Sequence, residues 1–403
     1  MRILFLDAYF EPEQIAFTHL ENDLLEGLVR AGHEVEIVCP TPTRGVSPIE
    51  VQEYKNRKDD TLHNGHVHVT RFLAPQEGKN PLIRALRYFW CNLRTYQIGK
   101  RMDGIDAVFA NSTPPTQGWI AGRVAQKKRI PFVYSLQDIF PDSLVTTGLT
   151  KQDSFLWKIG RKLEKVTYKR CSHIIVISEE MKKNLLQKNI RAKKISVISN
   201  WINMDEIYPI EKEKNALFDE FGINRNKYIV LYAGNFGAAQ GAEIVLDVAE
   251  ELQTEQDIQF VIFGSGAGYS EAEKRAEKLK NVFIHPLLPQ HRVPEVYSMG
   301  DVAIITCKKG VGKSGMPSKT WSIMACNIPI IASFDVDSEL SNILKNSNTG
   351  VSVEPESICA LVDEIRCFYK KKKKVDGRAY VKINASKDHC VKKYIDTILE
   401  ATM

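Results

Sequence analysis

The chain has 403 residues, 43% of them hydrophobic and 26% charged, with a formal net charge of +6. This length allows two globular domains with substantial cores, and the composition is ordinary for a soluble protein. The positive charge is too mild to indicate a nucleic-acid partner.

The eight cysteines show neither a CxxC motif nor metal-ligand spacing. Several lie inside apolar runs, so we expect buried thiols in a protein of the reducing cytoplasm. The first ten residues, MRILFLDAYF, are apolar but short, and we interpret them as a first strand and not as a signal peptide. No run of about 18 apolar residues occurs, so we expect no membrane span.

Short apolar runs alternate with helical patterns along the first half of the chain. This rhythm predicts parallel strands covered by helices on both faces. Predicted strands are 3–6, 34–38, 66–72, 107–110, 132–136, 174–177 and 195–198, and predicted helices include 18–30 and 155–170.

The rhythm breaks after residue 203 and restarts with strands at 228–234, 258–263, 282–285, 301–307 and 329–332. We therefore predict an α/β protein with two doubly wound, Rossmann-like domains that face each other across a cleft. The predicted boundaries are 1–203 for the first domain and 204–385 for the second. A last helix in 386–403 could pack on either domain.

The segment 310–339 concentrates devices that bind anions. A glycine- and lysine-rich loop follows a strand and enters a helix through Pro317, Ser318 and Lys319. Free N–H groups at the start of a helix, together with Lys313 and Lys319, suit a phosphate or diphosphate. The sequence therefore predicts a ligand with a phosphorylated handle, such as a nucleotide.

Two further glycine-containing turns follow strands in the second domain. One contains Asn235, Phe236 and Gly237 with Gln240 close behind, and the other contains Gly264, Ser265 and Gly266. Each turn alone is common for structural reasons, but three at strand ends in one domain favour a nucleotide cleft. The spacing matches neither the GxGxxG fingerprint nor the Walker loop.

In the first domain, Asp138 follows one predicted strand, and Thr113 follows another on the same rim. Such a carboxylate could act as a base, orient a sugar hydroxyl or stabilise positive charge. It could equally be a loop aspartate that caps a turn.

Two metal-like patterns are interpreted as structural. His63, His66 and His68 alternate along an exposed strand, and Asp335 and Asp337 are explained more simply as helix N-terminal caps. No metal site is predicted.

The helix expected within 80–102 mixes large apolar residues with arginines. It suits the surface of an anionic membrane, but core packing with the arginines outside explains it as well.

Taken together, these residues resemble bacterial glycosyltransferases of the GT-B fold, family four. The chain is most similar to transferases of N-acetylated or deoxy amino sugars, such as L-fucosamine transferases. The resemblance spans nearly the full length and rests on 137–142, 198–202, 233–237 with Gln240 and Gly241, 263–266, and 317–325.

The resemblance implies retaining transfer from a nucleotide sugar, most often UDP-linked, to a polyprenyl-diphosphate-linked acceptor in capsule, O-antigen or exopolysaccharide synthesis. It implies no metal requirement, a donor site in the second domain and an acceptor site in the first. It also implies a peripheral position at the inner face of the plasma membrane, and a last helix that crosses back to the first domain. Glu339, which closes the donor segment, joins the donor-binding candidates.

Several positions depart from the family pattern. Asn235 and Gln240 occupy places where many relatives carry an arginine and a lysine, which leaves Lys313 and Lys319 to contact the diphosphate. Ser314 and Ser322 replace two acids. Ile15-Ala16 replaces a glycine pair, with Thr18 and His19 nearby as acceptor-side candidates, and Asp138 stands where a histidine is common.

Two other functions stay open at this point. One is a UDP-sugar 2-epimerase on the same fold, and the other is a non-catalytic subunit that binds nucleotide sugars.

Overall fold

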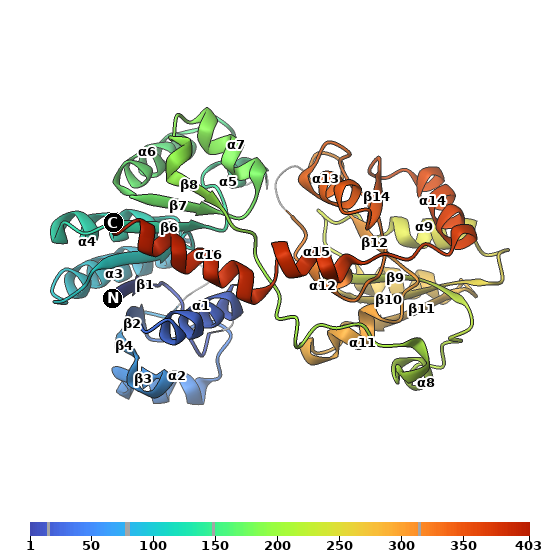
Figure 1. The fold of residues 1–403 in the computed structure, drawn as a ribbon, viewed down its shortest axis with the longest axis horizontal. Coiled ribbons are helices and arrows are strands. Elements are labelled where there is room, and N and C mark those ends of the chain that lie inside the picture. Colours follow the sequence, from blue (N-terminus) through green and yellow to red (C-terminus); the bar gives the residue numbers. More distant parts are fainter. Residues whose placement is uncertain (14–16, 77–80, 147–149, 313–315) are drawn as a thin grey trace. The chain divides into compact units, whose positions relative to one another are not determined.

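The computed structural model describes residues 1–13, 17–76, 81–146, 150–312 and 316–403. The backbone forms two compact units, each described by itself: unit 1 comprises 1–199 with 390–403, and unit 2 comprises 200–389 (Figure 1). Each unit contains one largely or wholly parallel sheet with helices on both faces. The predicted fold class, two Rossmann-like α/β domains, is confirmed.

Unit 1 has an eight-stranded sheet in the order β3-β4-β2-β1-β5-β6-β7-β8, in which only the β3–β4 pair is antiparallel. Its strands are β1 (Arg2–Leu6), β2 (Glu34–Pro40), β3 (Asp59–Leu62), β4 (Val67–Phe72), β5 (Ala107–Asn111), β6 (Phe132–Leu136), β7 (His173–Val176) and β8 (Ile195–Val197). Its helices are α1 (Thr18–Arg30), α2 (Pro48–Asn56), α3 (Pro81–Gly99), α4 (Thr116–Lys128), α5 (Asp142–Thr146), α6 (Phe155–Arg170) and α7 (Glu179–Gln187), with short 3₁₀ turns at His63–Gly65 and Ala192–Lys194.

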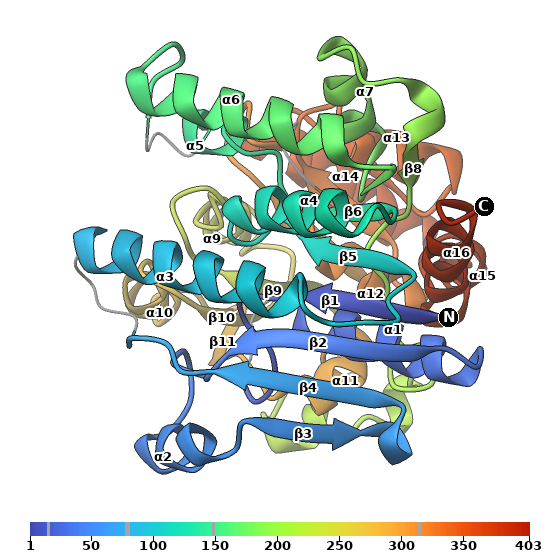
Figure 2. The same ribbon diagram turned by 90° about the vertical axis from the view of Figure 1, so that its left-hand side faces the viewer.

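Three of these helices, α3, α4 and α6, lie side by side on one face of the sheet (Figure 2). The core on this face combines buried strand residues with Cys91 of α3, Ala121 and Val124 of α4, and Tyr168 of α6. The strands are almost wholly buried because helices cover both of their faces, as the continuous apolar runs predict.

Unit 2 has a six-stranded parallel sheet in the order β11-β10-β9-β12-β13-β14. Its strands are β9 (Tyr228–Asn235), β10 (Ile258–Ser265), β11 (Val282–Pro286), β12 (Val302–Thr306), β13 (Ile330–Ser333) and β14 (Gly350–Val353). Its helices are α8 (Leu217–Glu220), α9 (Ile244–Glu251), α10 (Tyr269–Ala276), α11 (Val293–Tyr297), α12 (Lys319–Ala325), α13 (Glu339–Asn346), α14 (Ile358–Lys371) and α15 (Gly377–Asn384), with 3₁₀ turns at Lys212–Lys214 and Gln290–Arg292.

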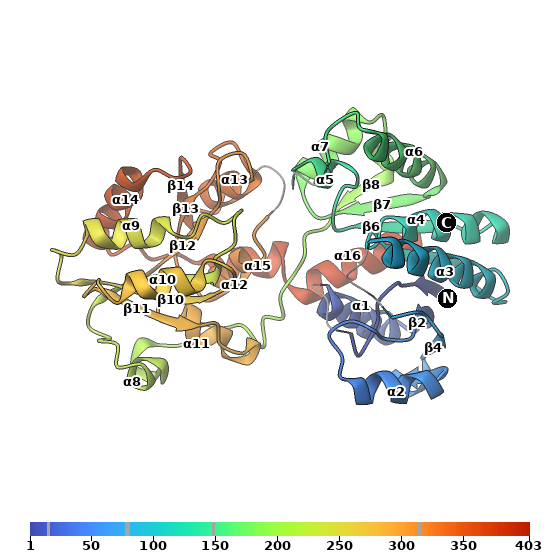
Figure 3. The same ribbon diagram turned by 180° about the vertical axis from the view of Figure 1, so that it is seen from behind.

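Separate apolar cores cover the two faces of this second sheet. Helices α9, α10 and α14 pack on one face (Figure 3), and α8, α11, α12, α13 and α15 pack on the other. Ser338 and Ser357 accept hydrogen bonds at the starts of α13 and α14, which satisfies backbone donors that the helices leave free.

Each sheet has a central strand with other strands added on both of its sides. β1 lies between β2 and β5, and β9 lies between β10 and β12. The carboxyl ends of such strands form a crevice, because the flanking connections leave in opposite directions. The residues at the carboxyl ends of β1 and β9 are therefore positioned to form a binding site.

The last helix, α16 (Lys387–Glu400), packs within unit 1 from residue 390 onward. Val391, Tyr394 and Ile398 are buried, and the Tyr394 hydroxyl lies 3.1 Å from the Ser135 Oγ of β6. A Cβ atom on Gly27 of α1 would overlap the side chain of Val391. The close approach of α1 and α16 thus depends on a glycine.

We predict that Gly27→Ala lowers the free energy of unfolding by about 1–3 kcal/mol, because the added methyl group overpacks this contact. At a helix position without such a contact, a change from glycine to alanine stabilises the protein by about 1 kcal/mol. A loss of stability at Gly27 would therefore identify overpacking as the cause. Urea unfolding followed by circular dichroism measures it. The double variant Gly27→Ala/Val391→Ala should recover part of the loss, and a stabilising single variant would contradict this packing.

Candidate functional site

Unit 2 contains a cavity of about 490 Å³ at the carboxyl ends of β9 and β12 and the start of α12. It brings together five of the predicted donor-binding residues, Asn235, Gln240, Pro317, Ser318 and Lys319. These residues come from segments about 80 positions apart in the sequence, and the parallel sheet places them at one edge.

Lys319 is the principal cation of this cavity wall. Its Nζ donates a hydrogen bond of 3.1 Å to the Ala233 carbonyl and lies 4.4 Å from the ring centroid of Tyr232. Burial lowers the pKa of Lys319 to about 8. No carboxylate in the part of the chain that the structure describes forms an ion pair with it, so the cavity presents a positive charge balanced only by a carbonyl and an aromatic face.

Two glycines make room for polar side chains of the cavity. A Cβ atom on Gly234 would lie 2.7 Å from Lys319 Nζ, so a larger residue would displace the ammonium group. Gly266 has φ +104°, a backbone conformation that favours glycine, and a Cβ there would overlap the Asn235 amide. Both glycines therefore act by leaving space.

Other predicted donor residues lie outside the lining. The Phe236 side chain is buried in the core against Tyr232 and Tyr269, so it does not line the cavity. Gly237, Gly264, Ser265, Gly266, Ser322 and Glu339 do not line the cavity. Lys313 and Ser314 lie outside the described residues.

The start of α12 differs from the prediction. The helix begins at Lys319, and Ser318 occupies the N-cap position without a side-chain capping bond, so Pro317 precedes the helix. The Pro317 carbonyl accepts a hydrogen bond of 3.0 Å from the Thr320 amide. Lys319 is thus the first helical residue, and its long side chain reaches back to β9.

Asp335 is buried and anchors the loop that contains Gly310 and Gly312. Its carboxylate accepts hydrogen bonds from the backbone amides of Gly310 (3.0 Å) and Gly312 (2.8 Å). Ser338, and not Asp335, caps α13. The predicted capping role of Asp335 is therefore wrong, because the carboxylate contacts a different segment.

Sequence reasoning missed the apolar wall of the cavity. Leu287, Leu288, Val293 and Val296 come from the end of β11 and from α11. The only signal was the apolar pair Leu287-Leu288 after a strand end. An apolar wall opposite a cation suits a ligand with a flat organic part and an anionic part.

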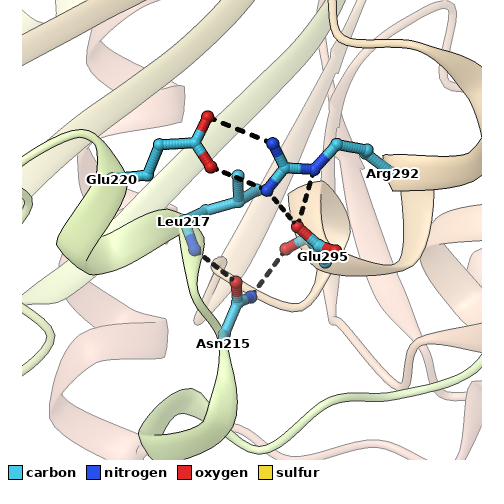
Figure 4. A network of polar contacts seen from close by, with 5 residues as sticks. All are labelled: Asn215, Leu217, Glu220, Arg292 and Glu295. Carbon is cyan, nitrogen blue, oxygen red and sulfur yellow. Dashed lines mark hydrogen bonds and ion pairs between the residues drawn. The ribbon is translucent and has the colours of Figure 1, made fainter.

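A polar network holds α11 against α8 (Figure 4). The Arg292 guanidinium donates to both carboxylate oxygens of Glu220 (2.8 and 3.1 Å), and its Nε donates to Glu295 (2.9 Å). These acceptors raise the pKa of Arg292 further above its usual range. Asn215 completes the network by donating to the Glu295 carbonyl (2.7 Å) and accepting from the Leu217 amide (3.1 Å).

In unit 1, Thr113 and Asp138 follow the neighbouring strands β5 and β6 and share one edge of the sheet. The backbone N–H of Gln137 donates to Ser112 Oγ (3.0 Å) and so joins the two loops. Asp138 is exposed and borders a small cavity with Ser112, Tyr134 and Glu164.

Thr18 and His19 begin α1, elsewhere in unit 1. The Thr18 hydroxyl donates a hydrogen bond of 3.1 Å to the Glu13 carbonyl, and His19 is exposed. The neighbouring Ile15-Ala16 lies outside the described residues.

A buried carboxyl pair at the end of β1 was not predicted. Asp7 and Glu21 are hydrogen-bonded to each other, and Asn111 of β5 donates to Glu21 (3.5 Å). Burial raises the pKa of Asp7 to about 7, and burial together with the Asp7 charge raises the pKa of Glu21 well above its usual value. In the sequence, the only indication of this pair was Asp7, a carboxylate directly after an apolar strand.

Within the described ranges, no group of three or more histidine, cysteine, aspartate or glutamate side chains is arranged to hold a metal ion. None of the helices described there is both long and apolar enough to cross a bilayer.

Two protein-family models match the chain in sequence. Residues 22–206 match the family described as Glycosyltransferase Family 4, and residues 213–388 match Glycosyl transferases group 1. Together the two models cover most of both units.

Curated relatives are similar over much of the chain. The putative colanic acid biosynthesis glycosyl transferase WcaI of Escherichia coli is 24% identical over 99% of this chain and 100% of the relative. The probable glycosyltransferase WbjE of Pseudomonas aeruginosa is 26% identical over 73% of this chain and 75% of the relative.

Solved structures share the fold. Sucrose-phosphate synthase of Thermosynechococcus elongatus has a TM-score of 0.72 at 15% identity, covering 99% of this chain and 98% of the other. HepE of Anabaena, solved in complex with UDP and glucose, has a TM-score of 0.70 at 16% identity, covering 99% and 100%.

The buried pair predicts a pH dependence of stability. Because the folded-state pKa of Asp7, about 7, exceeds its ordinary value of 3.8, the folded state binds the proton more tightly. The contribution of Asp7 to the free energy of unfolding should therefore fall as pH rises from about 4 to about 7 and then level off. Asp7→Asn, which cannot ionise, should flatten this slope in urea titrations across that range.

The exposed Asp153→Asn serves as the matched control and should keep the wild-type slope. Parallel slopes for Asp7→Asn and wild type would show that Asp7 is ionised in the folded protein at pH 5.

Proposed function

Because the chain belongs to the bacterial family 4 glycosyltransferases with the GT-B fold, we propose that its unit 2 cavity binds a UDP-sugar donor. We propose further that it transfers the sugar, with retention of configuration, to a lipid-linked acceptor held by unit 1. The second sheet supplies the donor contacts, and the carboxyl edge of the first sheet supplies Thr113 and Asp138.

The observation that carries the proposal is the environment of Lys319. A partly buried ammonium group without a described carboxylate partner stabilises a bound anion more strongly than a solvated lysine does, because little water screens the interaction. The cavity, about 490 Å³, lies within the usual range for small-molecule sites. HepE, which shares the fold and was solved with UDP bound, supports UDP as the nucleotide.

In the proposed reaction the bond between the anomeric carbon and the diphosphate oxygen breaks, and the acceptor hydroxyl forms the new glycosidic bond on the same face. Lys319 stabilises the growing negative charge of the leaving UDP, and Asn235 and Gln240 donate hydrogen bonds to it. The departing phosphate takes the acceptor proton. Asp138 then orients the acceptor or supports the positive charge that develops on the sugar ring.

We propose an N-acetylated or deoxy amino hexose as the transferred sugar and a polyprenyl-diphosphate-linked sugar as the acceptor, in capsule, O-antigen or exopolysaccharide synthesis. The name of WcaI supports a role in an extracellular polysaccharide. A relative from Finegoldia magna, 21% identical over 42% of this chain, is named for transfer to a pyrophosphoryl-undecaprenol acceptor. We also propose turnover without a divalent metal, since Asp335 of the Asp335-Asp337 pair accepts backbone hydrogen bonds.

We predict that UDP at a hundred times its dissociation constant stabilises the protein by about 2.7 kcal/mol, seen as a rise in melting temperature. Lys319→Ala should reduce this rise and lower turnover on the order of a hundredfold, since it removes an electrostatic contact to the leaving group. The exposed Lys345→Ala in α13 is the matched control and should behave as wild type.

Three outcomes of this assay would contradict parts of the proposal. A loss of less than threefold for Lys319→Ala would place the donor phosphates elsewhere. Interconversion of free nucleotide sugars without acceptor would indicate an epimerase. Donor binding without UDP release, in the presence of lipid acceptor, would indicate a non-catalytic subunit.

For Asp138, we predict that Asp138→Asn lowers turnover by about tenfold or more while UDP binding stays unchanged, because the residue belongs to unit 1. Steady-state UDP release and melting temperature with UDP test the two parts. Asp153→Asn, an exposed aspartate in the same unit, is the control. Turnover within about threefold of wild type would exclude the proposed role of Asp138.

A further inference from the structure

Helix α3 exposes its large apolar side chains to solvent and turns a stripe of other residues toward the core. Its buried stripe, at four-residue spacing, consists of Arg87, Cys91, Thr95 and Gly99. Its solvent face carries large apolar side chains with exposed fractions of 48, 69, 69, 43 and 40%, namely Ile83, Leu86, Phe89, Trp90 and Leu93. A helix that packed only on its own core would bury these residues and expose the arginine.

The rotation of α3 is fixed by specific contacts. The Arg87 guanidinium, 1% exposed, donates to Thr43 Oγ1 (2.8 Å) and to the Pro75 carbonyl (3.0 Å). Trp90 Nε1 donates to the carbonyl of Leu73 (3.0 Å), whose side chain is itself 53% exposed. The alternative interpretation, core packing with the arginines outside, is wrong for Arg87.

A second apolar group lies at the start of α6. Phe155, Leu156 and Ile159 are 82, 52 and 50% exposed. Helix α4 lies between α3 and α6 on the same face of the sheet (Figure 2). Each of the three helices follows a parallel strand and therefore begins at the carboxyl edge, so both apolar groups lie toward that edge.

The same three helices are strongly basic. They carry twelve lysine and arginine residues, all but Arg87 exposed or half-buried, and one carboxylate, whereas the net charge of the whole chain is +6. The carboxylate, Glu164, is buried and pairs with Lys188 (2.6 Å) and with Arg161. The basic residues are Arg84, Arg87, Arg94, Arg123, Lys127, Lys128, Lys158, Arg161, Lys162, Lys165, Lys169 and Arg170.

We propose that this face of unit 1, defined by α3, α4 and α6, docks on an anionic lipid bilayer, with the apolar residues of α3 and α6 inserted at two separate points. Interfacial helices combine Trp, Phe and Leu with Lys and Arg in this way, and each basic residue near an anionic surface adds attraction. Pairing of this face with a second copy is opposed, because it would bring two such basic surfaces together.

This inference rests on the proposed function and extends it. Thr113 and Asp138 follow strands β5 and β6 at the edge where α3 and α6 begin. A bilayer against the two apolar groups therefore lies beside the proposed acceptor residues. A lipid-linked acceptor could then reach them with its diphosphate still at the headgroup level.

The test is sedimentation of the full chain with vesicles, since binding to lipid is measured without any nucleotide. Vesicles of phosphatidylcholine with 30% phosphatidylglycerol should bind the wild type at least tenfold more strongly than phosphatidylcholine alone. Raising the salt to 0.5 M should weaken this binding, because it screens the basic face.

Two paired variants test the two insertion points separately. Leu86→Ser/Phe89→Ser and Phe155→Ser/Ile159→Ser should each lower the vesicle partition coefficient by about tenfold, while melting temperatures stay near wild type because these side chains are exposed. The control is Ile383→Ser in α15, which removes a residue of similar exposure, 64%, from unit 2 and should bind as wild type.

Wild-type binding that is equal on both vesicle types would overturn the proposal, as would an α6 variant that binds like wild type. A wild-type dimer in light scattering that the paired variants convert to monomers would assign the face to a second copy instead. UDP-induced stabilisation of the same variants is read separately. If UDP does not stabilise the wild type, the proposed donor site is contradicted. If UDP stabilises the wild type but the vesicles do not bind it, only the docking face is contradicted.

Discussion

The direction of parallel strands determines where chemistry can occur in this protein. Within each sheet the strands are parallel, except for β3 in unit 1, so the loops after the strands gather at one edge of that sheet. β1 and β9 have neighbours added on both sides, which opens a crevice beside each of them. The cavity in unit 2 and the acidic pair in unit 1 both lie at such positions.

The unit 2 cavity depends on glycines that leave space as well as on the side chains that line it. Gly234 gives Lys319 its position over the Tyr232 ring, and Gly266 leaves room for Asn235. Asp335 and Arg292 then hold the loop and the helix that form two of the walls. The charges of these two residues are used within the protein, whereas no carboxylate described in the structure balances Lys319.

Much of the fold could be predicted, because its elements follow simple local rules. The helices at 18–30 and 155–170 were predicted to the residue, and buried strands such as β5 and β6 appear as uninterrupted apolar runs. The pattern did not identify β3, whose sequence DDTL has no apolar run and which pairs only as an antiparallel edge. It also did not identify α2, which buries no residue and depends on the Ser47 capping box.

The site was predicted in part, for a related reason. Residues at the carboxyl ends of strands, such as Asn235, were recognisable, because position along a strand determines the edge at which they lie. Partners that are distant in sequence were not: nothing local pairs Arg292 with Glu220 or Asp335 with Gly312. The inward position of Arg87 could not be predicted either. The helical pattern of arginines and apolar residues allows either face of α3 to turn inward, and the partners that decide it, Thr43 and Pro75, are distant in sequence.

The lowered pKa of Lys319 has a consequence for ligand binding. Near pH 8 part of the free protein carries a neutral lysine, and a bound diphosphate would restore the charged form. Nucleotide binding would then take up a proton from the solvent, and the heat of binding would depend on the ionisation enthalpy of the buffer. Affinity would fall as the pH rises beyond 8, so the proposed donor site would couple nucleotide occupancy to the proton concentration around it.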